Sequence, residues 1–257
     1  MNRSSVRPSP LFLGLLGITV IGAVLCALPG ADPDSGSLTL LTVGVVLFVV
    51  GGWVVSLCLH EFGHAIVAYR GGDHEVAGRG YLTLDPRRYT DPVLSIVLPL
   101  VFLIIGGLPL PGGAVLINHW ALRSKPVESL VSLAGPLSNL VIGLVLNTAV
   151  LLAPMPVGLQ WAFSYLAFLQ VLTFFFNILP VPGFDGFGVL SPWLSREAQA
   201  VALRVRPWAP LVLFLLLFGV RQVSVVFLNI GYWLFALIGG NDQFSDIGSV
   251  LFRFWTR

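Results

Sequence analysis

The chain has 257 residues, of which 56% are hydrophobic and only 10% are charged, with a formal net charge of +2. Soluble domains carry about 25% charged residues, so the charged side chains here are too few to cover a globule with solvated groups. The composition therefore excludes a soluble enzyme, a disordered protein and a nucleic-acid binder, and it predicts a protein that lies in a membrane.

Charge-free stretches predict the membrane-spanning helices, and the first of them lies within residues 8–31. Arg3 and Arg7 precede it, so its beginning resembles a secretory signal peptide. The apolar run is long for a signal sequence and no clear small-x-small cleavage site follows it, which favours a retained first helix. The next uncharged run predicts a second helix over residues 40–69.

Residues 92–122 are also free of Asp, Glu, Lys and Arg, but prolines and glycines interrupt this run. A single crossing would place the basic residues after it outside, against the preference of Lys and Arg for the cytoplasmic side. We therefore expect a re-entrant or broken segment, since irregular backbone at membrane depth is tolerated where it lines a cavity or is buried in protein. Two nearby segments, 80–84 and 114–117, could each form a short strand.

The longest uncharged run covers residues 129–184. As one helix it would extend roughly 84 Å, nearly three times a hydrocarbon core of about 30 Å, so it must turn back. The turn is expected at residues 153–156, where two prolines break the helix. Two spans follow from this, over residues 130–152 and 159–179.

Two shorter apolar runs, 208–220 and 222–240, flank Arg221. They predict a hairpin that returns Arg253 and Arg257 to the inner side of the membrane. The fold class expected from all runs is all-α, a polytopic transmembrane helix bundle of about five or six spans plus the re-entrant segment. No long linker divides the chain, so residues 1–257 are expected to form a single integral-membrane domain.

Basic residues predict the orientation of the bundle. Arg3 and Arg7 place the N-terminus in the cytoplasm by the positive-inside rule. With the span order above, the arginine-containing segments 70–88 and 196–206 fall on the same side. The segments between spans that this order places outside carry few basic residues, so the charge pattern and the span order agree.

The second predicted helix ends with the pattern H-E-x-x-H, formed by His60, Glu61 and His64. Two histidines at positions i and i+4 lie on one helical face, so both imidazoles can reach one metal ion such as zinc. The glutamate between them can take a proton from an attacking water and deliver it to a leaving amine. By helical rise the histidines lie roughly 9 and 15 Å from Arg70, within the membrane. A polar cluster lining an aqueous cavity or an ion pathway is the alternative.

Two histidines need a third protein ligand that leaves a position open for water. Asp185 ends the long uncharged run and lies on the same side of the membrane as the histidines in the predicted topology. It follows Pro180 and Pro182, which make the local backbone irregular. The alternative is a loop aspartate that caps the next segment.

Three motifs in this order resemble the site-2 protease family of intramembrane zinc metalloproteases. They are H-E-F-G-H at residues 60–64, A-G-P-x-x-N at 134–139 and N-x-x-P-x-P-x-x-D-G at 177–186. The stretch 80–92 is similar to a compact prokaryotic branch of that family. The likeness covers about residues 45–190 and leaves no room for an inserted PDZ domain. Phe187 departs from the second glycine that many members carry after the aspartate, but it is not a ligand position.

The resemblance implies a zinc cofactor, one ion bound by His60, His64 and Asp185, with Glu61 as general base and acid. Asn177 matches a family asparagine thought to steady the scissile carbonyl or the oxyanion, which a side-chain amide donor can do. The alternative for Asn177 is an amide bonded to helix backbone. Asn139 could line the cavity or pack between helices.

The function that follows is a zinc endopeptidase that cleaves membrane-protein substrates within or near the bilayer, in regulated intramembrane proteolysis. Its partners are then a substrate transmembrane helix and the lipid bilayer, with no nucleic acid. A helical substrate must unwind locally to be cut and could pair as a strand along an edge of the enzyme. The resemblance places the chain in a prokaryotic cytoplasmic membrane. A proteolytically silent relative that binds membrane clients and a metal or ion transporter are the alternatives.

Overall fold

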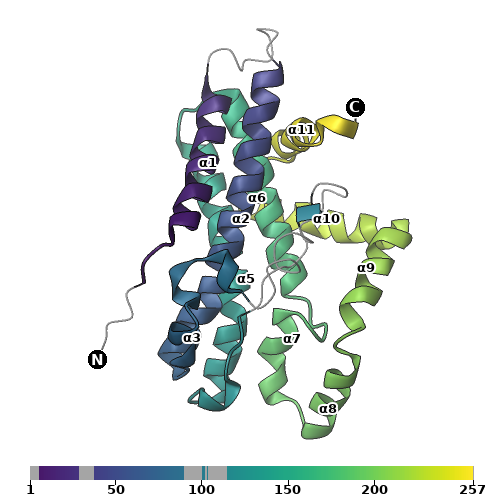
Figure 1. Cartoon of the computed structure of the whole chain (residues 1–257). Coiled ribbons are helices and arrows are strands. Elements are labelled where there is room, and N and C mark those ends of the chain that lie inside the picture. The colour runs from purple at the N-terminus through teal and green to yellow at the C-terminus, as the bar shows by residue number, and fades with distance from the viewer. Residues whose placement is uncertain (1–5, 29–37, 90–99, 102, 104–114, 257) are drawn as a thin grey trace.

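The computed structural model of the chain describes residues 6–28, 38–89, 100, 101, 103 and 115–256 (Figure 1). Every regular element in these ranges is helical, and none of the described residues belongs to a strand. The all-α class predicted from the apolar runs is therefore confirmed. Most of the segment 92–122, expected to be re-entrant, lies outside the described residues.

Four helices among the described residues are long and apolar enough to cross a membrane. They are α1 (Pro10–Ala27), α2 (Leu38–Gly71), α5 (Lys125–Leu152) and α6 (Val157–Asn177). A fifth span results if α8 (Arg196–Val205) and α9 (Ala209–Gly219), which meet at a bend of 56°, are counted as one. The protein is thus a multi-pass membrane protein, and the predicted turn at residues 153–156 separates α5 from α6.

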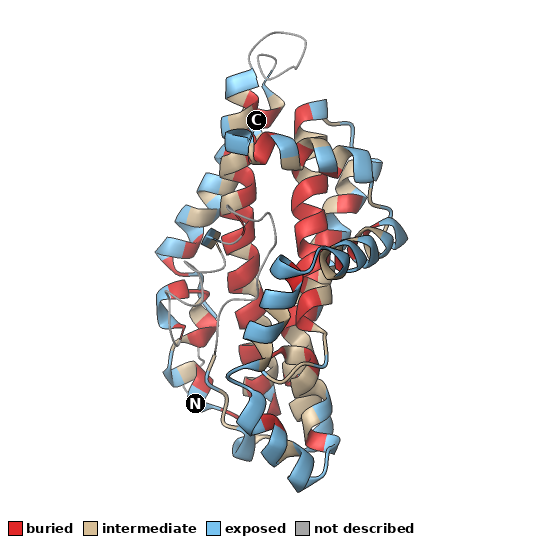
Figure 2. Cartoon of the chain, turned by 90° about the vertical axis from the view of Figure 1, so that its right-hand side faces the viewer, coloured by how far each residue is buried: buried red, intermediate tan, exposed pale blue. Residues whose placement is uncertain are grey.

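Helix α6 forms the centre of the bundle. Its apolar window is 67% buried inside the protein, against 17% for α1, which faces outward. Figure 2 shows buried residues running along the middle of the bundle and exposed ones on the outer helices. In α5, Gly143 lies against α6, where an added Cβ would be 3.3 Å from the Ala167 carbonyl oxygen. Small residues at such contacts let transmembrane helices approach closely.

Short elements cover one end of the bundle, namely α3 (Glu75–Gly78), η3 (Tyr81–Thr83), η4 (Pro86–Arg88) and η6 (His119–Ala121). The strand predicted over residues 80–84 is wrong, because this segment is the 3-10 turn η3. Gly80 and Leu84 flank the turn with φ angles of 79° and 57°, and left-handed residues cannot continue an extended strand. Residues 115–117 have no regular structure, and Ala114 lies outside the described residues.

After α6 the chain continues through α7 (Asp185–Leu190), η7 (Ser191–Trp193), α8 and α9 into α10 (Arg221–Leu237), α11 (Asp242–Phe252) and η8 (Phe254–Thr256). The predicted hairpin of the last two apolar runs is wrong, because α10 lies across the bundle instead of returning along α9 (Figure 1). The reason is that α10 packs closely on α6. A Cβ added to Gly231 of α10 would lie 2.3 Å from the side chain of Leu172 in α6, so the two helices are in direct contact.

Helix α11 therefore lies at the end of the bundle opposite to that expected for Arg253. Gly248 of α11 contacts the Trp161 backbone near the start of α6, just after the α5–α6 turn. In Figure 1 α11 and η8 lie toward the upper end, whereas α3, α7 and α8 lie at the lower end. Arg253 and the arginines of α8 thus lie at opposite ends of the bundle.

Candidate metal centre

Helix α2 carries His60, Glu61 and His64 in its C-terminal half. The helix is apolar over most of its length, and all three side chains are buried. Ionisable groups inside a span are costly and face the protein interior, where partners or a cavity compensate them. Here they face α5, where an added Cβ on Gly63 would be 2.9 Å from the Ala134 carbonyl oxygen.

Asp185 reaches the histidines because the chain folds back at the end of α6. Gly183 adopts a φ of 110°, and an added Cβ on Gly186 would lie 2.0 Å from the Ile178 carbonyl oxygen. Only residues without a side chain allow this close return of the backbone. The first residue of α7, Asp185, is thereby held against α2.

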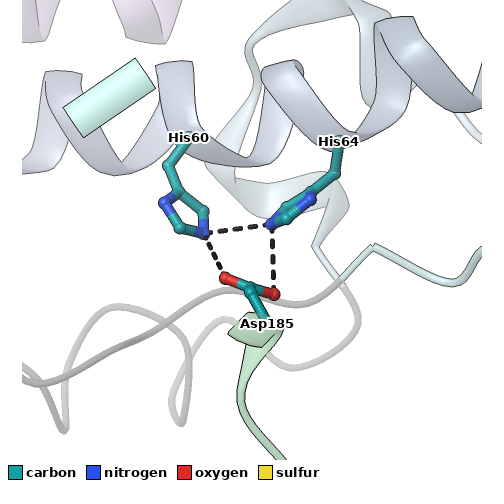
Figure 3. A group of neighbouring side chains, drawn as sticks. All are labelled: His60, His64 and Asp185. Atoms are coloured by element: carbon teal, nitrogen blue, oxygen red, sulfur yellow. Dashed lines mark hydrogen bonds and ion pairs between the residues drawn. The ribbon is translucent and has the colours of Figure 1, made fainter. Parts of the chain in front are cut away.

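The three predicted ligands converge on one point (Figure 3). Asp185 Oδ2 lies 3.2 Å from His60 Nε2, and Asp185 Oδ1 lies 3.4 Å from His64 Nε2. The two Nε2 atoms are 3.1 Å apart, and one donor atom from each residue lies within 4.8 Å of the others. The structure thus brings Asp185 together with the two histidines.

The other ring nitrogens show that this arrangement fits a cation. His60 Nδ1 lies 2.6 Å from Asn139 Oδ1, and His64 Nδ1 lies 2.7 Å from the Val131 carbonyl oxygen. A carbonyl can only accept, so His64 carries its proton on Nδ1 and presents the Nε2 lone pair. Such contacts orient metal-binding histidines and raise their basicity. Two nitrogen lone pairs and a carboxylate directed at one point are a donor set for zinc.

Gly135 keeps the space in front of these donors free. An added Cβ at this position would lie 2.2 Å from His64 Nε2 and 2.6 Å from His60 Nε2. Any other residue would therefore place carbon where a metal ion must be. The glycine of the A-G-P segment is needed by the shape of the site.

A segment without regular secondary structure, residues 115–118, runs beside Glu61. The backbone N–H of Val115 lies near the Glu61 carboxylate. Further along, Arg79 Nη1 donates to the Leu116 carbonyl oxygen at 3.3 Å, and the Asn118 N–H donates to the buried carboxylate of Asp73 at 2.8 Å. These contacts fix residues 115–118 next to the glutamate.

The loop over residues 81–89 supports α2 just before the site. Tyr89 donates its hydroxyl to the Cys58 carbonyl oxygen at 3.3 Å. Asp85 accepts from the Arg87 side chain at 2.7 and 3.0 Å, and this charged partner holds the pKa of the Asp85 carboxyl below its ordinary value. Asp85 is therefore ionised at neutral pH and closes the loop as a charged pair.

The two asparagines singled out in the sequence differ in their contacts. Asn177 Nδ2 donates to the Thr173 carbonyl oxygen at 3.0 Å, which is the helix-backbone bond considered as its alternative. An amide nitrogen has two hydrogens, so one N–H remains for another acceptor. Asn139 contacts His60 directly, so it orients a predicted ligand in addition to packing between helices.

Sequence reasoning missed three contributors, Ser56, Gln170 and the Val131 carbonyl. Gln170 Oε1 accepts from Asn139 Nδ2 at 2.7 Å, and Gln170 Nε2 donates to Ser56 Oγ at 2.9 Å. The signal for Gln170 was present, because a single amide in an otherwise apolar stretch of a span is costly and marks a functional position. No sequence signal identifies a backbone carbonyl as a partner.

Several curated proteins are similar to this chain over most of its length, and they are named as zinc metalloproteases. Rip2 of Mycobacterium tuberculosis is 46% identical over 99% of this chain and 97% of its own, and Rip2 of Mycolicibacterium smegmatis is 41% identical over 99% and 96%. YwhC of Bacillus subtilis is 32% identical over 78% of this chain and 90% of its own. No protein-family model matches the chain, and no solved structure does. These near full-length similarities show that the chain belongs to the site-2 protease family and is a zinc-dependent intramembrane metalloprotease.

Proposed function

We propose that His60, His64 and Asp185 hold the zinc ion at which this protease cleaves transmembrane segments of its substrates. The observation that carries the proposal is the convergence of these three donors in front of Gly135, with each Nδ1 held by an acceptor. A closed structural zinc site has four protein ligands, whereas three protein ligands leave a position open for water and substrate. The donor set therefore supports a catalytic site.

Glu61 acts as general base and general acid in this proposal. When bound, zinc supplies Lewis-acid polarisation of the scissile carbonyl and of the attacking water. Glu61 accepts the proton of that water and passes it to the nitrogen of the leaving amine, so its carboxylate must be held near both. The carboxylate is buried, and the nearby Val115 N–H is a neighbour that can orient it.

Asn177 stabilises the developing oxyanion in the same proposal. Its amide is buried at the end of α6, eight residues before Asp185, and its bond to Thr173 fixes the direction of the side chain. The second N–H of the amide is the donor offered to the substrate. A preorganised donor of this kind stabilises charge that appears only during the reaction.

The substrate is a membrane protein that presents an unwound stretch of a transmembrane helix. A helix keeps its carbonyl groups in internal hydrogen bonds, so it must open before it can be cut. Residues 115–118, held beside Glu61, are the segment along which we place the unwound stretch. The whole chain, residues 1–257, acts as one membrane domain in this scheme.

The N-terminus lies in the cytoplasm of a prokaryotic cell in this proposal, with α8 on the same side. The support is that α3 and α8 share one end of the bundle, where arginines are frequent (Figure 1), and that the Ser9 N–H before α1 donates to the Thr83 carbonyl oxygen of η3 at 2.8 Å. In cells with intact inner membranes, an impermeant maleimide should label Ala153→Cys at the α5–α6 turn but not Ala200→Cys in α8. Both alanines are exposed, so they form a matched pair. Labelling of Ala200→Cys alone would reverse the orientation.

An Asp185→Ala variant tests the ligand set. We expect zinc affinity to fall by more than about 100-fold, since loss of a group that merely contacts a ligand already costs 10–100-fold. The measurement is the zinc content of purified protein in detergent, with thermal unfolding recorded in parallel. Asp242→Ala in α11, remote from the site, is the control and should keep its zinc. Full zinc occupancy in a folded Asp185→Ala protein, or a folded wild type without zinc affinity, would contradict the proposed site.

A further inference from the structure

We propose that a relay of buried hydrogen bonds across α2, α6 and α5 selects the ring nitrogen that His60 presents to the metal, with Gln170 as the positioning residue. The inference rests on the proposed zinc site and concerns side chains outside the ligand set. None of these side chains belongs to the H-E-x-x-H motif or to the aspartate motif.

The relay is continuous from a backbone carbonyl to the histidine. Ser56 Oγ donates to the Trp53 carbonyl oxygen at 2.7 Å and accepts from Gln170 Nε2 at 2.9 Å. Gln170 Oε1 accepts from Asn139 Nδ2 at 2.7 Å, and Asn139 Oδ1 lies 2.6 Å from His60 Nδ1. Each contact is at hydrogen-bond distance, and the shortest, between His60 and Asn139, lies just below the usual N–H···O range.

The chemistry of its end point gives the relay a direction. The Trp53 carbonyl can only accept, so the Ser56 hydroxyl spends its hydrogen there and offers only lone pairs to Gln170. Gln170 must then turn its NH2 group toward Ser56 and its oxygen toward α5. That oxygen in turn selects the NH2 group of Asn139, which leaves the Asn139 oxygen facing His60.

His60 therefore carries its proton on Nδ1 and directs the Nε2 lone pair at the metal position. His64 needs no relay, because its partner is the Val131 carbonyl, which has one polarity only. The partner of His60 is an amide, which could face the ring with either end. The relay supplies the polarity that an amide alone lacks.

Burial makes this selection effective. Gln170 is 0% exposed, Asn139 1% and Ser56 3%, so water has little access to replace a broken contact. A reversal of either amide would place NH2 against NH2 or oxygen against oxygen and leave buried groups unsatisfied. The side chains of three helices thus hold a single arrangement.

The test compares zinc affinity, measured by competition with a chromophoric chelator, in variants of the full chain in detergent. Gln170→Leu should weaken zinc binding about 10–100-fold, the range for groups that orient a ligand. Gln170→Glu keeps an oxygen toward Asn139 and should restore most of the affinity. Asn147→Leu is the matched control, since Asn147 is a buried amide of α5 whose Nδ2 has no partner among the described residues. It should bind zinc as the wild type does.

A second measurement reads the ring directly. In zinc-free Asp185→Ala protein, which lacks the carboxylate 3.2 Å from His60 Nε2, the ¹⁵N shifts of labelled histidine should show His60 protonated on Nδ1, and the chain has only four histidines to assign. Gln170→Leu should give a mixture of tautomers for His60 and leave His64 unchanged. A merely structural role for Gln170 would change stability without changing the tautomer.

The outcomes separate the relay from the site. A wild type that binds no zinc overturns the proposed function, while the tautomer of His60 still decides the relay. A Gln170→Leu protein with wild-type zinc affinity and an unchanged tautomer overturns the relay and leaves the site intact. If Gln170→Leu does not fold, Ser56→Ala removes the anchoring hydroxyl with a smaller change in volume, and a mixture of His60 tautomers is again expected.

Discussion

A Glu61→Gln variant is expected to lose peptide-bond cleavage by about 10²–10⁴-fold, the usual contribution of a general acid–base group, while keeping its zinc. The amide has nearly the shape of the carboxylate and keeps an acceptor oxygen near the Val115 N–H, but it cannot take a proton from water. Glu61 is not among the three converging donors, so its exchange leaves them in place. The measurement is cleavage of a library of transmembrane peptides by purified protein in detergent, together with zinc content.

Glu197→Gln is the control for this experiment, because Glu197 is an exposed carboxylate of α8 and remote from the site. It should cleave as the wild type does. Cleavage at the wild-type rate by Glu61→Gln would contradict the role given to this glutamate. A membrane client that Glu61→Gln binds and the wild type cuts is a substrate. A scaffold would also bind such a client, but its wild-type form would not cut it.

A Gly135→Ala variant is expected to lose zinc binding by more than about 100-fold, although it adds only one methyl group. The new Cβ would lie 2.2 and 2.6 Å from the two Nε2 atoms, inside the space that the ion must fill. Loss of a group that merely orients a ligand costs 10–100-fold, and obstruction of the metal position itself should cost more. Zinc affinity and thermal unfolding are measured on the same preparation.

Gly143→Ala in the same helix is the matched control. Its nearest contact would be 3.3 Å, so a shift of a few tenths of an ångström accommodates the methyl group. It should keep zinc and change stability little. Stoichiometric zinc in Gly135→Ala at wild-type affinity would show that the ion does not lie in front of this glycine, and the proposed ligand geometry would then be wrong.

Sequence reasoning was sufficient where a structural feature depends only on residues close together in the chain. A pair of histidines four residues apart on a helix must share a face, and α2 places both on the inner side. The length of the uncharged run 129–184 requires a turn, and its prolines fix the position between α5 and α6. Asp185 could be chosen as the candidate third ligand because few acids lie near the ends of apolar runs.

Sequence reasoning failed where the conformation or direction of a segment depends on contacts with distant segments. Residues 80–84 alternate like a strand, but the left-handed backbone at Gly80 and Leu84 closes a turn against neighbours that the pattern does not name. The apolar run after Arg221 has the composition of a span, yet its packing against Leu172 of α6 turns α10 across the bundle. Hydropathy measures the preference of a segment for lipid and contains no information on direction.

The sequence alone therefore determined that the chain is a helical membrane protein with two histidines on one face of a span and a glutamate beside the first of them. These properties depend on composition and on the period of the helix, which act within a few turns. Only the tertiary structure decided that Asp185 meets them and that Gly135 leaves room in front of them. It alone joined Ser56, Gln170 and Asn139 into one relay to His60. Those relations join residues up to 125 positions apart, and they exist because the helices pack closely enough for their polar groups to pair.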